Sequence, residues 1–160
     1  MKQILQFALV VLFAILISSC SSDDYEPSVK INHVEKEIAA VLNGKFIGSK
    51  QSLSDNIIEY QEITFTPYSE PVSEKWTEEG SHIDIEKDVV MFGECDVLKY
   101  YNDHLMEISS HWKYSINVSY DGAQPRLYFY PDFYGRYELH YITKKSPTSF
   151  ELDGILFNKE

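Results

Sequence analysis

The chain has 160 residues, with 14 Lys and Arg against 25 Asp and Glu, and its formal net charge is −11 at pH 7. This length fits a single domain that can bury a real hydrophobic core. The acidic balance repels phosphate backbones, and Lys144 and Lys145 form the only adjacent basic pair, which argues against nucleic acid as a partner.

Residues 1–19 have the pattern of a lipoprotein signal peptide that ends directly before Cys20. Lys2 supplies a short positive region, residues 4–17 are apolar except for Gln6, and two serines precede the cysteine. The apolar run is shorter than the ~18 to 20 residues that a membrane-crossing helix needs, and an acidic segment follows it without a positive flank. We expect cleavage before Cys20, and the alternative is an ordinary secretory signal.

Residues 20–30 are polar, contain Pro27 and show no hydrophobic period, so we expect a flexible tether there. Residues 31–160 are predicted to form one domain, because they contain no internal repeat and no linker long enough to divide them. Once Cys20 carries lipid, Cys95 stands alone. We expect Cys95 to be a buried apolar residue without a disulfide or a catalytic role.

One short amphipathic helix is predicted over residues 32–42. Asn32 is a suitable N-cap, and Gly44 follows the last apolar position of the pattern. Four apolar residues have the spacing of a single helix face, namely Val34, Ile38, Val41 and Leu42.

Beyond Gly44 the hydrophobic period changes to two, which is typical of half-buried antiparallel strands. Segments rich in Gly, Pro, Asp and Ser separate the alternating runs. The expected strands cover residues 45–51, 58–66, 72–76, 89–98, 106–120 (bent or bulged), 126–130, 136–144 and 149–158. We therefore predict a mainly β domain with about eight antiparallel strands in a barrel, because closure removes exposed edges. A two-sheet β-sandwich is the alternative.

The end of the signal resembles the lipobox of bacterial lipoproteins. This resemblance implies a diacylglycerol on the Cys20 sulfur and an acyl chain on its amino group, and several such chains hold a protein firmly to a membrane. The residues behind it are similar to the export signal of surface-displayed lipoproteins of the Bacteroidota, namely Ser21, Ser22, Asp23 and Asp24. The implied location is the outer membrane, lipid-anchored and at the cell surface. A periplasm-facing protein is the alternative.

The start of the β domain resembles small bacterial lipocalin-like lipoproteins, in which a helix leads into a Gly-x-Trp motif whose ring plugs the barrel base. Gly44, Lys45 and Phe46 occupy that motif here, with Phe46 in place of the tryptophan. Residues 62–68, 100–104 and 120–125 are also similar to uncharacterised Bacteroides lipoproteins. The resemblance implies a lipocalin-like barrel and a location, but it supplies no reaction, because the function of that family is not established.

The sequence shows no clear catalytic or metal-binding set. His104, Glu107 and His111 would share a helix face, but the alternating pattern predicts a strand, on which His104 and Glu107 point to opposite faces. Phosphate-binding glycine loops, nucleophile elbows and His-Glu-x-x-His motifs are missing from the sequence. We predict no catalytic residue, no metal and no cofactor, and a hydrolase is the least favoured function.

Aromatic residues are the best candidates for binding. Such rings line cavities for apolar or planar ligands or form surfaces on which glycan rings stack, although strand propensity alone also favours them. The candidate ligand or partner contacts are Trp76, Tyr101, Trp112, Tyr128, Tyr130 and Tyr134. We expect a non-enzymatic binding module for a small apolar molecule or a glycan. The alternative is an accessory platform for an envelope protein partner.

Overall fold

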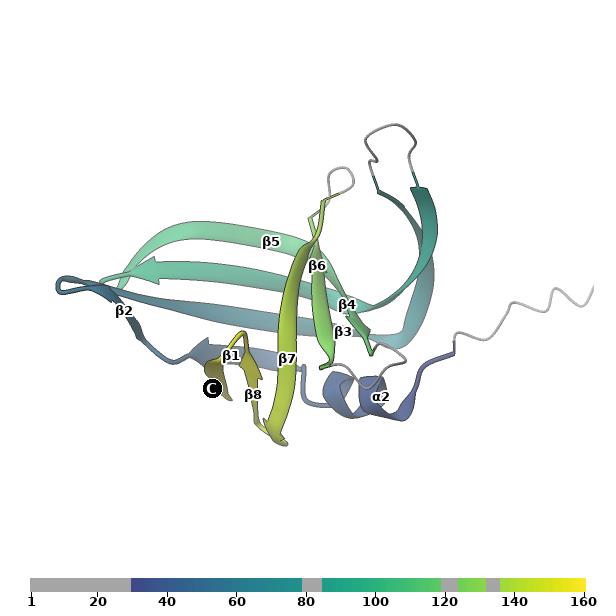
Figure 1. Cartoon of the computed structure of the whole chain (residues 1–160), viewed down its shortest axis with the longest axis horizontal. Coiled ribbons are helices and arrows are strands. Elements are labelled where there is room, and N and C mark those ends of the chain that lie inside the picture. The colour runs from purple at the N-terminus through teal and green to yellow at the C-terminus, as the bar shows by residue number, and fades with distance from the viewer. Residues whose placement is uncertain (1–29, 79–84, 119–123, 132–135) are drawn as a thin grey trace, which may run out of the picture.

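The computed structural model describes residues 30–78, 85–118, 124–131 and 136–160. Within these residues it contains one short helix, α2 (His33–Ala39), followed by nine strands (Figure 1). The strands are β1 (Gly44–Gly48), β2 (Gln51–Ser54), β3 (Ile57–Glu78), β4 (Ile85–Tyr101), β5 (His104–Asn117), β6 (Arg126–Tyr130), β7 (Glu138–Ser146), β8 (Ser149–Leu152) and β9 (Ile155–Lys159). No helix within the same residues is long and apolar enough to cross a membrane.

Eight of these strands form a closed antiparallel barrel. Hydrogen-bonded neighbours follow the order β1-β9-β8-β7-β6-β5-β4-β3-β2, and β1 also pairs with β3, which closes the sheet. In the closing pair Phe46 lies opposite Ile63, while β2 pairs with β3 outside the ring. The predicted mainly β barrel with a short preceding helix is confirmed and is consistent with a lipocalin-like fold. The sandwich alternative is wrong, because a single sheet closes on itself.

Two predicted strands merge into β3. A turn was expected at residues 67–71, but β3 runs through it as one strand of 22 residues. Pro67 pairs with Gly93 and Val72 pairs with Met91, so the four residues between Pro67 and Val72 oppose one residue of β4. The turn-forming residues therefore make a large bulge that bends the strand without ending it.

The predicted strand over residues 149–158 divides into β8 and β9. Leu152 pairs with Ile155 across a two-residue turn made by Asp153 and Gly154. Both turn residues have positive φ, 48° and 86°, as a tight hairpin of this type requires. An Asp-Gly pair between two alternating segments is a recognised hairpin signal, and it accounts for the division of the predicted strand into two.

Side chains fill the interior of the barrel. Phe46 is fully buried, and its ring centroid lies 5.0 Å from that of Phe150 and 6.1 Å from that of Phe65. Cys95 is buried too, as expected from the sequence. The buried cluster comprises Ile38, Val41, Leu42, Phe46, Ile63, Phe65, Phe92, Cys95, Tyr114, Ile116, Leu127, Phe129, Ile142, Phe150, Leu152 and Phe157.

The helix is held at its start by the predicted cap. Asn32 Oδ1 accepts a hydrogen bond from the Glu35 backbone N–H at 2.8 Å, and Glu35 Oε2 accepts one from the Asn32 N–H at 3.0 Å. This reciprocal capping box satisfies two N–H groups that a helix end leaves unpaired. Ile38 on the helix, with Val41 and Leu42 after it, packs against the buried cluster and anchors the segment to the barrel.

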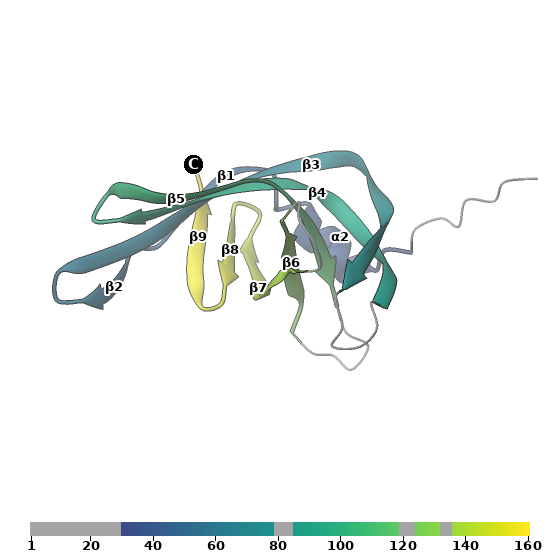
Figure 2. The same cartoon turned by 90° about the horizontal axis from the view of Figure 1, so that it is seen from above.

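Three strands extend beyond the rest of the barrel. β3, β4 and β5 have 22, 17 and 14 residues, whereas β6 has 5 and β7 has 9. At one end they project with β2 as an extension that we call the shelf, made of residues 51–54, 57–62, 98–101 and 104–108 (Figures 1 and 2). At the other end, residues 72–78 and 85–92 curl away as a hairpin arm that we call the overhang.

The shelf corrects one expectation about side-chain direction. Lys99 pairs with Glu107 and Tyr101 pairs with His104, although the register shifts between these pairs. Lys99 and Tyr101 lie on the same face of β4, so His104 and Glu107 also lie on one face. The opposite-face prediction is wrong, because a bulge adds one residue and reverses the alternation. The shelf also exposes large apolar side chains, namely Leu53, Ile57, Ile58, Leu105, Met106 and Ile108.

Candidate ligand-binding cleft

A cleft opens where β4 and β5 diverge. The two strands pair from Gly93 with Tyr114 to Tyr101 with His104. Beyond Gly93, the overhang part of β4 pairs with β3, whereas residues 115–117 of β5 pair with β6. The gap between the diverging strands forms a cleft of about 810 Å³, which we call the lateral cleft. It is lined by Lys30, Ile31, Asn32, Glu35, Lys87, Asp88, Val89, Val90, Ser115, Ile116, Asn117, Val118, Tyr128, Tyr130 and Tyr137.

Gly93 lies where β4 diverges from β5, and the close approach of β3 leaves no room there for a side chain. A Cβ atom at this position would clash with the Thr66 carbonyl oxygen and would lie 2.7 Å from the Pro67 Cα atom. It would also lie 2.9 Å from Cε1 of the Tyr114 ring, which covers the glycine. The bend that creates the lateral cleft therefore combines a glycine on β4 with the bulge opposite it on β3.

The wall of the cleft is aromatic. Leu127 and Phe129 of β6 point into the core, so Tyr128 and Tyr130, which alternate with them, lie on the outer face of the strand. The Trp76 ring of the overhang packs edge-on against Tyr130, with ring centroids 4.7 Å apart. Three of these rings line the cleft, because Tyr137 lies 5.3 Å from Tyr128 and 6.0 Å from Tyr130 between centroids, and Trp76 joins the cluster through its contact with Tyr130.

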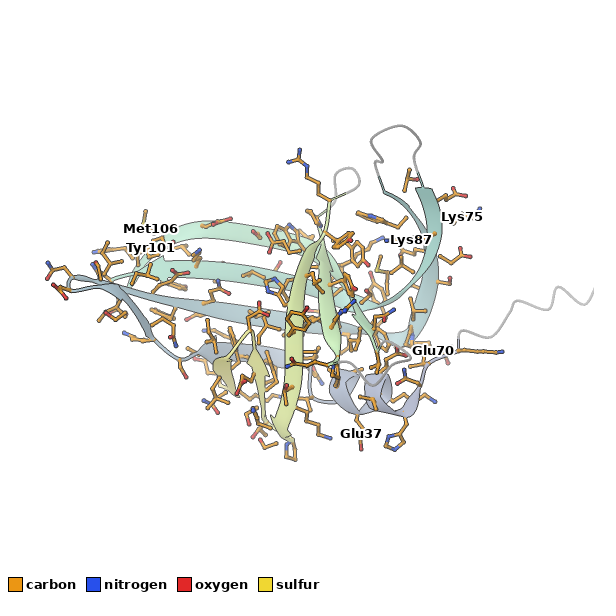
Figure 3. The ribbon with its side chains drawn as sticks, in the orientation of Figure 1. Glu37, Glu70, Lys75, Lys87, Tyr101 and Met106 are labelled. Atoms are coloured by element: carbon orange, nitrogen blue, oxygen red, sulfur yellow. The ribbon has the colours of Figure 1, made fainter. Side chains whose placement is uncertain are left out.

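Charged groups connect the overhang to the barrel wall. Lys113 Nζ donates to Glu74 Oε2 at 2.6 Å, which links β5 to the overhang. Lys87 Nζ lies 5.2 Å from the centroid of the Tyr137 ring, a cation–π distance. Figure 3 shows Lys87 within the curve of the overhang, whereas Lys75 points away from it. These two contacts, together with the packing of Trp76 on Tyr130, hold the overhang over the tyrosines.

Hydrogen-bonding groups lie beside the rings. Ser115 Oγ donates to the Tyr130 hydroxyl at 3.3 Å, and burial raises the pKa of that hydroxyl. Glu35 Oε1 accepts a hydrogen bond from the Val118 N–H at 3.3 Å, so the start of the helix closes one end of the cleft. The cleft thus combines ring faces with hydroxyl, carboxylate and ammonium groups.

The predicted contact residues fall into three groups. Tyr128 and Tyr130 line the lateral cleft, and Trp76 packs against Tyr130. Tyr101 lies on the shelf (Figure 3), and Trp112 lies over Phe129 with centroids 6.5 Å apart. The positions that lie outside the described residues are Tyr134, Cys20, Ser21, Ser22, Asp23 and Asp24.

The predicted contacts include only Tyr128 and Tyr130 of the cleft lining, and the residues that they miss include Tyr137 and Lys87. Tyr137 directly precedes a strand, where a tyrosine is explained by strand propensity alone. Lys87 lies in a run of charged residues, which is typical of a solvent-exposed face. The signal that could have found Tyr137 is the density of tyrosines over residues 128–137.

The lateral cleft presents aromatic, hydrogen-bonding and charged side chains. Among the described residues, no group of three or more His, Cys, Asp and Glu side chains is placed to hold a metal ion. Cys95 lies in the core, where burial raises the pKa of its thiol and keeps it protonated. No family model, no curated protein and no solved structure matches this chain.

Proposed function

We propose that this protein is a lipid-anchored binding module of the bacterial outer membrane that holds a glycan in the lateral cleft. The observation that carries the proposal is the cluster of Trp76, Tyr128, Tyr130 and Tyr137 beside hydrogen-bonding and charged groups. Sugar rings have apolar faces that stack on aromatic rings and hydroxyl edges that need hydrogen-bond partners. The lateral cleft offers both.

A glycan suits this molecule better than a small apolar ligand. The interior of the barrel is the most apolar site for such a ligand, and it is occupied by Phe46, Phe65, Phe129 and Phe150. The lateral cleft instead lies between the overhang and the outer wall of the barrel, with Ser115 and Asp88 among its lining residues. An apolar occupant would cover these polar groups without offering them hydrogen bonds, which is unfavourable.

Glycan binding is tested first with the soluble domain, residues 28–160, on an array of neutral and acidic oligosaccharides. A hit is then measured by titration calorimetry with Tyr128→Ala, which removes one stacking face. We expect about a tenfold loss of affinity, corresponding to about 1.4 kcal/mol. Tyr141→Ala is the matched control, because Tyr141 is an exposed tyrosine of β7 away from the cleft. An array without hits, or equal losses for the two variants, contradicts the proposal.

The proposed location rests on Cys20 and the segment behind it. We expect labelled palmitate to enter the wild-type protein and not the Cys20→Ala variant, and the variant to leave the membrane fraction. Protease treatment of intact cells should remove the protein if it is displayed at the surface. Protection from protease in cells that still label with palmitate favours the periplasm-facing alternative.

A further inference from the structure

The shelf has an unpaired strand edge on β5. β5 pairs with β4 from His104 to Tyr114, whereas β6 pairs with β5 only from Lys113 onward. Among the described residues, no strand pairs with the other side of residues 104–112, a stretch that we call the free edge. The side chains from His104 to Ile108 are all exposed. The backbone N–H and C=O groups along such an edge can pair with a further strand.

The composition of the free edge favours pairing with another strand. Exposed edge strands are commonly protected by lysine or proline, and residues 104–112 contain neither. Leu105, Met106 and Ile108 expose 45%, 62% and 61% of their surface, and Figure 3 shows Met106 at the rim of the shelf. Such a concentration of large apolar side chains on a projecting edge is typical of an interaction surface.

We propose that the free edge pairs with the same edge of a second copy of this chain. The two strands run antiparallel about a two-fold axis, so that Leu105 of each copy lies opposite Ile108 of the other. The bulge at Met106 allows this register. Leu105 pairs with Tyr100 and Ile108 pairs with Leu98, and these two partners are two residues apart on β4. Leu105 and Ile108 therefore point to the same face of the sheet, although they are three residues apart in sequence.

A second copy fits this edge in side-chain pattern. The two-fold axis generates two Leu–Ile pairs on the outer face of the shelf, where the rings of Tyr60 and Tyr100 stack with centroids 4.7 Å apart. His104 lies opposite Ser109 of the second copy, and both positions belong to the other face. An edge that matches itself in this way suits an isologous contact, in which both copies use the same surface.

The second copy also fits in space. The pairing ends before Lys113, where β6 already occupies the edge, so no existing strand pair is displaced. The shelf projects from the barrel at the end opposite α2 (Figures 1 and 2). Because the paired strands run in opposite directions, the two barrels lie at opposite ends of the joined shelves.

One pair of like charges opposes the contact. Glu107 of each copy lies near the axis, on the face where Glu107 pairs with Lys99 of β4. The charges at the tip are balanced, because Lys50 Nζ lies 2.6 Å from Asp103 Oδ1. Like charges that face each other across strands are unfavourable, so we expect Glu107→Gln to tighten the dimer about twofold to fivefold. A weaker dimer in this variant contradicts the proposed register.

Dimerisation is measured by sedimentation equilibrium of the Cys20→Ala protein, which lacks the lipid. A contact of this size belongs to the weak class, so protein concentrations extend to about 1 mM. We expect Ile108→Lys to weaken the dimer at least tenfold, because it places a charge in each Leu–Ile pair. Leu53→Lys is the matched control, because Leu53 is 57% exposed on β2, the opposite edge of the shelf. A parent protein that stays monomeric, or equal losses in the two variants, overturns the proposal.

The register is tested with Leu105→Cys and Ile108→Cys, each in the Cys20→Ala background. In the proposed dimer these two positions face each other, whereas each lies about 8 Å from its own copy across the axis, too far for a disulfide. We therefore expect oxidation of the mixed proteins to give disulfide-linked dimers, and oxidation of either protein alone to give few. Cys95 is buried and does not compete. Equal cross-linking of Ile108→Cys with itself overturns the register.

This inference is independent of the proposed function. The free edge covers residues 104–112, whereas β5 lines the lateral cleft only from Ser115 onward. A glycan identified on the array should therefore bind Ile108→Lys as tightly as the parent protein. Loss of the dimer with retained glycan binding supports two separate surfaces, and an equal loss of both contradicts them.

Discussion

Replacing Gly93 by alanine tests the origin of the lateral cleft. The new Cβ atom would meet the Thr66 carbonyl oxygen and the Pro67 Cα atom, which both belong to the backbone of β3 and cannot rotate away. Overpacking of this kind costs about 1 to 3 kcal/mol, and we expect the upper part of that range because two of the contacts are backbone atoms. The paired strands must move apart at the bulge to relieve the contact.

The cost is measured by urea unfolding followed by far-UV circular dichroism. With a slope of about 1 to 3 kcal/mol per molar urea, a loss of 3 kcal/mol lowers the midpoint by about 1 to 3 M. Gly154→Ala is the control, because Gly154 has φ of 86° but a Cβ there would meet nothing within 4 Å. Its cost is the left-handed backbone penalty alone, about 1 to 2 kcal/mol.

The loss of stability in Gly93→Ala, compared with that in Gly154→Ala, tests this explanation of the bend. If Gly93→Ala costs less than Gly154→Ala, the close approach of β3 to Gly93 does not govern the bend, and the explanation of the cleft fails. If Gly93→Ala unfolds at lower urea and also loses the glycan identified on the array, the bend and the cleft are linked.

Three further predictions concern buried groups and the helix cap. The Tyr114 hydroxyl is buried without a hydrogen-bond partner among the described residues, so Tyr114→Phe should leave stability at pH 7 unchanged or raise it by about 1 kcal/mol. Burial raises the pKa of Tyr114 in the folded state, so above about pH 10 the unfolded chain loses this proton first and the free energy of unfolding falls. In urea titrations at pH 9 to 11, the Tyr114→Phe variant should therefore lose less stability than the wild type. In a Cys20→Ala protein, burial and the raised pKa of Cys95 predict that a thiol reagent at pH 8 reacts only after urea unfolding, and rapid reaction of the native protein would refute this. Asn32→Ala removes the capping box and should cost about 1 kcal/mol, whereas His33→Ala, at the next exposed position, should cost little.

Local sequence patterns predicted much of the fold. The apolar spacing and the Asn32 cap indicate the helix, and two-residue alternation indicates the strands, because both signals depend on neighbours in the chain. The burial of Cys95 followed from its apolar surroundings. The segment over residues 67–71 misled the prediction, because pairing with β4 continues on both sides of the bulge and outweighs the turn-forming residues.

The candidate site was only partly predictable. Tyrosine and tryptophan enrichment pointed to Trp76, Tyr128 and Tyr130, but the same criterion also selected Tyr101 and Trp112, which lie elsewhere. Composition alone cannot say which rings share a surface.

The amino-acid sequence determined an acidic, mainly β chain with a capped helix, because hydrophobic period, capping and turn chemistry are local properties. Only the tertiary structure decided that the barrel is filled, that its longest strands project at both ends, and that a cleft opens beside Tyr130. These features depend on register between distant strands: Trp76 reaches Tyr130 because β4 leaves β5 at Gly93. Asp153 likewise meets His140 only because the β8–β9 turn lies against β7. No short stretch of sequence contains that information.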